Sequence, residues 1–349
     1  MSNKSLTHFV LRTMLAALPV LLFIVTYIVL DPFRVIHRYN DLSENDSMRL
    51  GCNAAFVSIT SLERNLAAGR HYDSFIFGSS MSQAFKAQYW QPHLAHDASI
   101  FHLDASEETI QGIVDKIHYL HKHHIKIKNA LIVMEELSLH RTPNDHNFLF
   151  TRVPSTTSDV TWLQFQLQFF NIFKHPDFVC YSIYPSKWQD KMLTKHYITR
   201  NITTHIDSIN ENIYAGIDSI IAIDPDLYYT PEQMKLNSFL ILPDAHSPGI
   251  NATIEHSLQE LAQLLKNDGT DYHFIIPPRY NRDPLTSWDL ATLQLHLGVN
   301  RVHDMTQHPL SKNSHSYYDS AGHLISARCK TILDDALAIN IHYQSESSH

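Results

Sequence analysis

The chain has few cysteines and no dense basic stretch, and both shortages exclude classes of function. Its three cysteines, Cys52, Cys180 and Cys329, are widely separated and form no Cys-x-x-Cys pair. This spacing indicates neither a zinc ribbon nor a thiol redox motif, and it assigns no disulfide. The formal net charge is -8, whereas binding to phosphates needs a concentrated basic surface. We therefore expect no nucleic-acid partner.

Internal repeats and low-complexity segments are also lacking, but histidine is plentiful, with 25 residues that include the run His121-Lys122-His123-His124. Metal sites need ligands that converge on one point rather than a run. The run is expected to be a solvated surface at the end of a helix, so we predict no metal and no cofactor. With 349 residues, 44% of them hydrophobic, the chain is long enough to bury a sizeable core.

The amino-terminal segment is predicted to lie in a membrane. Met14 to Leu30 contains no charged residue over 17 positions, with Lys4 and Arg12 before it and Asp31 after it. This length is near the lower limit for crossing ~30 Å of hydrocarbon. A cleaved signal peptide has a shorter apolar region and a small-residue cleavage site, which this segment lacks. Residues 1–30 are therefore expected to form an uncleaved single-pass anchor.

The positive flank of that anchor predicts that the N-terminus stays in the cytoplasm. The anchor would then sit in the cytoplasmic (inner) membrane, with the main domain on the extracytoplasmic side. Residues 31–70 are mixed and polar and are interpreted as a membrane-proximal connector with some helix near 61–68.

Residues 71–340 are predicted to form one α/β domain. Short apolar runs typical of buried parallel strands occur at 74–77, 100–103, 130–134, 274–276 and 301–305. Apolar residues at helical spacing fill 110–120, with Ser106 as the expected cap, and the pattern recurs at 254–265. Alternating strands and helices predict a three-layer, doubly wound, mostly parallel sheet of the flavodoxin-like kind.

The stretch from about 139 to 249 breaks this alternation and is expected to be a long insertion. Within it, Trp162 to Phe173 fits both a strand alternation and a helical stripe of aromatic residues. We favour the helix. Its aromatic stripe is expected to be buried by internal packing, as most large apolar side chains are.

A serine follows the first strand of the sheet. The run Ser74 to Phe77 stops at Gly78, which is followed by Ser79, Ser80, Met81 and Ser82. Loops at the carboxyl ends of parallel strands are where α/β proteins bind ligands, and a helix N-terminus there offers free N–H groups to an oxyanion. Ser80 is the candidate nucleophile, with Ser79 and Ser82 as local alternatives. The competing interpretation is a helix cap.

A base for such a serine is found after the last strand. His323 has a pKa range suited to accepting a serine proton, and Asp319 is placed to orient the imidazole ring. Asp304, at the end of the last strand, is an alternative orienter. Ser80, after the first strand, and His323, after the last, would then lie at the same carboxyl edge of the sheet.

This combination resembles the SGNH, or GDSL-type, hydrolase superfamily. Gly78-Ser79-Ser80-Met81 looks like its Gly-Asp-Ser-Leu block, and Asp104 to Thr109 looks like its second block. Asp319 to His323 is similar to its last block, Asp-x-x-His, with one extra residue. The resemblance covers about residues 70–340. It implies Ser80, Asp319 and His323 as catalytic residues, and Ser106 and Glu107 as oxyanion or substrate-binding residues.

Three positions depart from that pattern. Ser79 replaces the usual aspartate, Glu107 replaces a glycine that offers its backbone N–H, and Met134-Glu135-Glu136 stands where an oxyanion-binding asparagine is usual. Backbone donors at Ser80 and Glu107 survive these changes, but the asparagine has no evident substitute. Loss of one such donor costs roughly 3 to 4 kcal/mol of transition-state stabilisation. A weakened or altered hydrolase is therefore expected.

Membrane-anchored members with a plain Gly-Ser-Ser motif resemble the accessory proteins of membrane-bound O-acyltransferases, of the D-alanyl-transfer and alginate-acetylation types. That resemblance implies a serine O-acyltransferase or esterase that acts on O-acyl groups of a cell-envelope glycan, beside a membrane-bound O-acyltransferase. One alternative is a non-catalytic SGNH-like envelope protein that binds a glycan or an assembly partner through the insertion. Another is a metal-dependent phosphoesterase that uses some of the many histidines.

Overall fold

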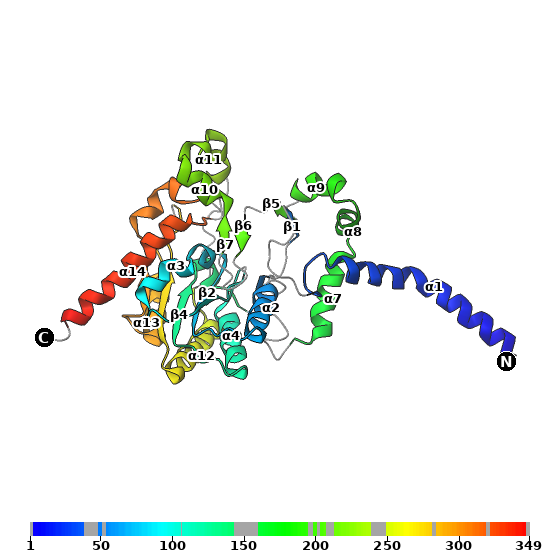
Figure 1. The fold of residues 1–349 in the computed structure, drawn as a ribbon, viewed down its shortest axis with the longest axis horizontal. Coiled ribbons are helices and arrows are strands. Elements are labelled where there is room, and N and C mark those ends of the chain that lie inside the picture. Colours follow the sequence, from blue (N-terminus) through cyan, green and yellow to red (C-terminus); the bar gives the residue numbers. More distant parts are fainter. Residues whose placement is uncertain are drawn as a thin grey trace.

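A five-stranded parallel sheet lies at the centre of the computed structural model (Figure 1). The structure describes residues 3–37, 48–50, 54–105, 107–142, 160–194, 198–200, 203–206, 213–238, 249–280, 284–318 and 322–346. The sheet consists of β2 (Ser74–Gly78), β3 (Ile100–His102), β4 (Asn129–Val133), β8 (Asp271–Ile276) and β9 (Val302–Asp304). All five predicted strands are confirmed, and so is the α/β class.

The strand order places a topological switch point beside β2. Neighbours in the sheet follow the order β3-β2-β4-β8-β9, which becomes 2-1-3-4-5 when the five strands are numbered along the chain. This is a common doubly wound order, and ligands in such sheets bind outside the carboxyl ends of the strands where the winding reverses. Here that point lies between β2 and β4. The strand β2 ends at this point with Gly78.

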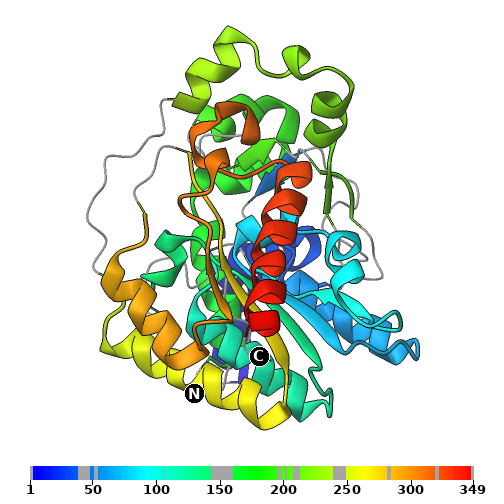
Figure 2. The same ribbon diagram turned by 90° about the vertical axis from the view of Figure 1, so that its left-hand side faces the viewer.

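Helices cover both faces of the sheet (Figures 1 and 2). Alternate strand residues such as Phe75 and Ile132 pack against α2 (Ala54–Ala67), α4 (Ile110–Lys122), α12 (Ala252–Asp268) and α13 (Ser287–Leu297). Their neighbours Ile76 and Val133 pack against α3 (Ala87–Trp90) and α14 (Ser326–Glu346). The period-two alternation of strands thus fills two apolar layers. The α2 helix, within the expected connector, belongs to the first layer.

The expected helices are confirmed, with one corrected cap. The N-cap of α4 is Thr109, whose hydroxyl accepts a hydrogen bond from the backbone N–H of Gly112 at 3.0 Å. The sequence predicts Ser106 as that cap, but Glu107 has a left-handed backbone with φ 58°, which ends any helical path from Ser106. Ser106 itself lies outside the described residues. The second expected helix, α12, ends at Gly269, which has the left-handed conformation common at helix C-termini.

The amino-terminal helix is α1 (Asn3–Leu30). Its segment Thr7–Leu30 is long and apolar enough to cross a membrane by length and composition. It leads away from the sheet domain in Figure 1. Asp31 follows it and accepts hydrogen bonds from the backbone N–H groups of Val35, Ile36 and His37 at 2.7–3.0 Å.

The long insertion is preceded by α5 (Glu136–Leu139) and consists of short elements. Its described helices are α7 (Trp162–Phe173), α8 (Pro176–Ile183), α9 (Pro185–Thr194), α10 (Gly216–Ile223) and α11 (Pro231–Ser238). Two small antiparallel pairs join β1 (Met48–Leu50) to β5 (Ile198–Arg200), and β6 (Thr203–Ile206) to β7 (Ile213–Ala215). The helix expected at Trp162 to Phe173 is confirmed. Of its aromatic stripe, Phe165, Phe169 and Phe173 are buried as predicted, whereas Trp162 is exposed, contrary to the prediction.

Candidate functional site

The turn after β2 is fixed by a glycine. Gly78 has φ 145°, and a Cβ atom on it would lie 2.0 Å from the carbonyl oxygen of Val133 on β4. No residue with a side chain fits this backbone at this distance. The chain then enters η1 (Ser80–Ala84), a 3-10 helix whose N-cap is Ser79. The helix N-terminus expected after β2 is that of this 3-10 helix, and the α-helix α3 begins at Ala87.

Three serines surround this turn, and their hydroxyl groups have different partners. Ser79 is buried, and its hydroxyl donates to Oε2 of Glu135. Ser82 is also buried, and its hydroxyl donates to the carbonyl oxygen of Ser79 at 2.7 Å. Ser80 is partly exposed, and its Oγ lies 2.8 Å from Nε2 of His323. Of the three, Ser80 is the serine with both access from solvent and a base within hydrogen-bond distance.

His323 is presented by a loop that closes on itself. An isolated β-bridge joins Tyr317 to Leu324, and the backbone N–H of Tyr318 donates to the carbonyl oxygen of His323 at 3.0 Å. The ring of Tyr318 stacks on the imidazole, with ring centroids 5.6 Å apart and planes 15° apart. These contacts hold the imidazole over the β2–η1 turn. The structure therefore brings together Ser80 and His323, which are 243 residues apart in the chain.

The insertion contacts the loop that carries His323. The contacting residues, Tyr228 and Tyr229, directly follow η3 (Pro225–Leu227). The hydroxyl of Tyr228 donates to the carbonyl oxygen of Tyr318, and that of Tyr229 donates to the carbonyl oxygen of His315 at 2.8 Å. The rings of Tyr229 and His315 stack with centroids 4.3 Å apart. Burial raises the pKa of Tyr229 to about 12, so its phenol stays a donor at neutral pH.

A carboxylate on α10 also caps the helix that follows the loop. Asp218 accepts the backbone N–H of Ser326 at 3.0 Å and the Ser326 hydroxyl, and Lys86 lies 3.3 Å from the same carboxylate. Ser326 is the first residue of α14. Asp218 therefore ties the insertion, the α14 N-terminus and the residue before α3 into one cluster. Sequence reasoning missed Asp218, Tyr228 and Tyr229, since none of them belongs to a recognisable motif.

The two candidate orienting aspartates fall in different places. Asp319 lies outside the described residues, so its role stays a prediction. Asp304 is at the end of β9, where its Oδ1 accepts the backbone N–H of Thr306 at 3.0 Å and the Thr306 hydroxyl at 2.7 Å. One oxygen of Asp304 is thus engaged in the turn that follows its own strand.

The loop after β3 carries the second group of expected residues. Asp104 is buried and accepts a hydrogen bond from Nε2 of Gln83 on η1 at 2.7 Å. Glu107 has the left-handed backbone described above, and its carboxylate pairs with the Arg141 guanidinium. Of the two oxyanion candidates, the structure describes Glu107.

A buried ion pair supports the same loop from within. Lys116 on α4 pairs with Glu108 and donates to the carbonyl oxygen of Leu103 at 2.9 Å. Burial raises the pKa of Glu108, an effect that the charge of Lys116 opposes. Lys116 therefore connects both Leu103 and Glu108 to α4.

Glu135 belongs to the segment Met134-Glu135-Glu136 that follows β4. Its Oε2 accepts the Ser79 hydroxyl, and its Oε1 accepts the Ser138 hydroxyl at 2.7 Å. A carboxylate in this position accepts hydrogen bonds and cannot donate one to an oxyanion. The sequence showed both Ser79 and Glu135 as departures, and the structure shows that they are partners.

A scan against protein-family models gives no match, and neither does a search of curated proteins.

Metal-ligating and thiol groups are the other candidates for chemistry in this chain. Within the described ranges, no group of three or more His, Cys, Asp or Glu residues is arranged to hold a metal ion. Cys180 and Cys329 are free thiols. Burial raises the pKa of Cys329 well above its usual value, which keeps that thiol protonated and unreactive.

Proposed function

We propose that the protein is a membrane-anchored, extracytoplasmic serine acyltransferase or esterase of the SGNH type, acting on O-acyl groups of a cell-envelope glycan. The observation that carries the proposal is the 2.8 Å contact between Ser80 Oγ and His323 Nε2. It lies where β2 ends at the switch point of the sheet. A serine within hydrogen-bond distance of an imidazole is the arrangement that nucleophilic acyl transfer needs.

The reaction would proceed through an acyl-serine. Nε2 of His323 accepts the hydroxyl proton while Ser80 Oγ bonds to the acyl carbonyl carbon. The resulting imidazolium then gives this proton to the oxygen of the leaving alcohol as the ester bond breaks. In the second half a sugar hydroxyl or water gives its proton to His323 and attacks the acyl carbon. The imidazolium then returns this proton to Ser80 Oγ as the bond between the acyl carbon and Oγ breaks. Transfer and hydrolysis differ only in the acceptor of this last step.

Two backbone features support an oxyanion site at this turn. The first N–H groups of a helix have no partner within the helix, so the N–H of Ser80 at the start of η1 is a candidate donor. Glu107 holds φ 58°, a conformation that suits glycine, and the SGNH pattern has glycine at this place. Glu107 thus keeps the backbone of the pattern without its residue type.

The third donor is lost, because Glu135 accepts from Ser79 and Ser138. One missing donor is worth roughly 3 to 4 kcal/mol in acyl-transfer enzymes. We therefore expect slow turnover with water. A protein that receives its acyl group from a membrane-bound O-acyltransferase and passes it to a glycan needs an acyl-serine that resists water, and slow hydrolysis is consistent with that role.

Covalent labelling tests the nucleophile. The full-length protein, reconstituted in membranes, is treated with a fluorophosphonate probe as wild type, Ser80→Ala, His323→Ala and Ser82→Ala. We expect no labelling of Ser80→Ala, a loss of at least 100-fold in the labelling rate of His323→Ala, and near wild-type labelling of Ser82→Ala.

Equal labelling of Ser80→Ala and wild type would remove Ser80 as the nucleophile. A folded wild-type protein that takes up no probe, and that binds an acylated glycan without releasing its acyl groups, would instead favour the non-catalytic alternative. Circular dichroism of each variant shows whether the fold is kept.

A further inference from the structure

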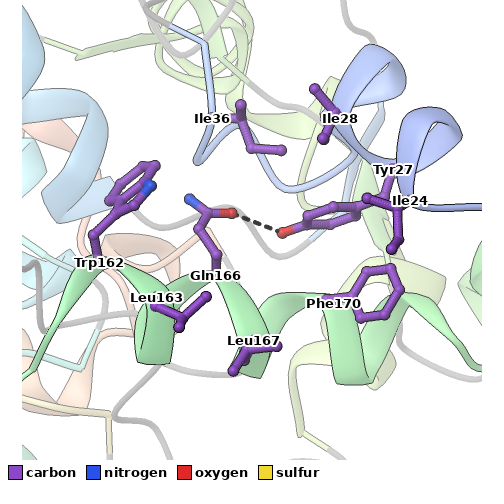
Figure 3. Close-up of a pocket in the computed structure, with 9 residues that line it drawn as sticks. All are labelled: Ile24, Tyr27, Ile28, Ile36, Trp162, Leu163, Gln166, Leu167 and Phe170. Carbon is purple, nitrogen blue, oxygen red and sulfur yellow. Dashed lines mark hydrogen bonds between the residues drawn. The ribbon is translucent and has the colours of Figure 1, made fainter. Parts of the chain in front are cut away.

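The helix α7 lies against the last turns of α1, and the two together form an apolar groove (Figure 3). We propose that α7 is an in-plane helix embedded in the outer leaflet of the membrane, and that lipid acyl chains fill the groove between α7 and α1. The inference rests on the proposed membrane anchoring by α1. It adds a second contact between the protein and the bilayer.

The contacts of α7 fix its depth relative to the anchor. Phe23 of α1 packs against Phe170 and Phe173 of α7, with ring centroids 5.5 and 5.2 Å apart. Phe23 belongs to the uncharged segment of 17 residues that ends at Leu30, and this segment is about 26 Å long at 1.5 Å per residue. Leu30 then lies near the outer boundary of ~30 Å of hydrocarbon. Phe23, seven residues earlier, lies about 10 Å below it.

An element that touches Phe23 must therefore lie at or below the membrane surface. Amphipathic helices that lie in the interface bury their apolar face about 5–10 Å into it, which matches this depth. Figure 1 shows α7 crosswise to α1. If α1 crosses the bilayer, α7 lies parallel to the surface of the bilayer.

The composition of α7 fits that place. None of its 12 residues is charged. One face, with Phe165, Phe169 and Phe173, is buried in the protein. On the rest of the helix, Trp162, Leu163 and Leu167 expose 48%, 67% and 48% of their surface. Gln164 and Asn171 are exposed beside them. An uncharged helix that exposes three large apolar side chains is unusual in water, whereas Trp at the level of the headgroups is common.

The groove itself offers an apolar lining. It encloses about 360 Å³ between α7 and the segment that runs from α1 to Ile36, and its lining comprises Ile24, Tyr27, Ile28, Ile36, Trp162, Leu163, Gln166, Leu167 and Phe170. The polar groups in it bond to one another, because the Tyr27 hydroxyl donates to Gln166 Oε1 at 3.1 Å and Gln166 Nε2 donates to the carbonyl oxygen of Val35 at 2.8 Å. Apart from the indole of Trp162, the remaining lining offers an occupant hydrocarbon contact.

Continuity with the anchor favours lipid over a protein partner. Ile24 and Ile28 line the groove and also belong to the segment Thr7–Leu30, of which the protein buries almost nothing. The lipid that surrounds an isolated span therefore reaches the groove without crossing any polar surface. A partner protein would have to displace that lipid from a groove whose lining is mostly apolar.

Quenching of tryptophan fluorescence by brominated lipids tests the inference. The full chain is reconstituted in vesicles of phosphatidylcholine brominated on its acyl chains, as wild type, Trp162→Phe and Trp288→Phe. Trp288 is the matched control, since it is 65% exposed but lies on α13 in the sheet domain. We expect the lipid-quenchable fluorescence to fall by at least half in Trp162→Phe and to stay unchanged in Trp288→Phe. An equal quenched signal in Trp162→Phe and wild type would overturn the proposal.

Two further measurements separate the possible failures. Release of the wild-type protein from vesicles by alkaline carbonate would contradict the anchoring by α1, whereas a retained protein without Trp162 quenching contradicts the position of α7 alone. A photoactivatable residue at Leu167, compared with one at Leu295 on α13, identifies the occupant in cells. Lipid adducts specific to position 167 support the proposal, and a predominant polypeptide adduct overturns it.

Discussion

The two partners of the candidate catalytic pair are held in different ways. Ser80 follows a turn whose shape is set by the backbone of the sheet, through the close approach of Gly78 to Val133. His323 lies on a loop that is bonded to the insertion through Tyr228 and Tyr229. The serine is therefore placed by its immediate neighbours in the chain and the sheet. The histidine depends on residues about 90 positions away.

This difference gives the insertion a defined role. The contacts of Asp218 with Ser326 connect residues 108 positions apart, and they fix the start of α14 just after His323. Removing such contacts should move the base and leave the nucleophile in place. Removing the backbone support of the serine should instead disrupt the sheet itself, because β2 and β4 are central strands.

The largest effect is expected from Gly78→Ala. The new Cβ would lie 2.0 Å from the Val133 carbonyl oxygen at a φ of 145°, so β2 and β4 must separate or the turn must change. We expect the free energy of unfolding to fall by about 4 kcal/mol or more. Chemical denaturation measures it. The matched control is Gly69→Ala, which also has a positive φ but has no atom within 4 Å of its would-be Cβ.

Gly69→Ala should cost about 1 kcal/mol, the penalty of the left-handed backbone alone. Similar losses in the two variants would show that the sheet relaxes around the methyl group added at position 78. The turn before Ser80 would then not be fixed by the close approach of Gly78 to Val133.

The next effect is expected from Asp218→Ala, on the histidine side. The variant removes the cap of α14 and the carboxylate partner of Lys86. We expect a loss of about 2 to 3 kcal/mol in stability and, in the folded protein, a labelling rate with fluorophosphonate at least tenfold lower, since His323 is no longer held on Ser80. Stopped labelling reactions followed by gel fluorescence give this rate.

Asp226→Ala is the control, because Asp226 is exposed on the neighbouring η3 helix. It should keep both stability and labelling. An Asp218→Ala protein that is destabilised but labels at the wild-type rate would show that the insertion stabilises the fold without positioning the base.

The contrast between the two sides also explains what could be predicted from the sequence. The strands, the serine turn and the helix α7 are local patterns, and each lies where the sequence predicts it. His323 could be found because it follows the last strand and therefore shares an edge with Ser80. The cap at Thr109 was missed, since the left-handed backbone of Glu107 depends on the fold around it. Asp218, Tyr228 and Tyr229 carry no pattern, because their roles arise only when distant segments meet.

A third effect is expected in the pH dependence of stability, and it arises from two histidines on neighbouring strands of the sheet. His273 on β8 and His303 on β9 lie with Nδ1 and Nε2 3.0 Å apart. Burial lowers the pKa of each to about 4, and for His303 the neighbouring His273 adds to this. Their usual pKa is 6.5, so between pH 6.5 and 4 the unfolded chain binds more protons than the folded one. Stability is then complete above pH 6.5 and falls as the pH decreases through this window.

Replacing one of these two histidines should reduce the slope of the free energy of unfolding against pH. We expect His303→Gln to remove about 1.4 kcal/mol per pH unit from it between pH 6 and 5, measured by urea unfolding at several pH values. An unaltered slope in His303→Gln would mean that other groups cause the acid sensitivity.

The smallest effect concerns Glu107, whose left-handed backbone lies beside the serine turn. Both Glu107→Gly and Glu107→Ala remove the ion pair with Arg141, so a comparison of the two isolates the backbone. At φ 58° glycine is unstrained, whereas alanine costs about 1 kcal/mol. We therefore expect Glu107→Gly to be more stable than Glu107→Ala by about 1 kcal/mol in thermal or chemical unfolding. If alanine were equally stable, the loop would adopt another backbone in solution, and the N–H of Glu107 would lose its place as an oxyanion donor. If glycine is favoured, the loop beside the serine turn keeps its left-handed backbone in solution, and the N–H of Glu107 keeps its place as a candidate oxyanion donor.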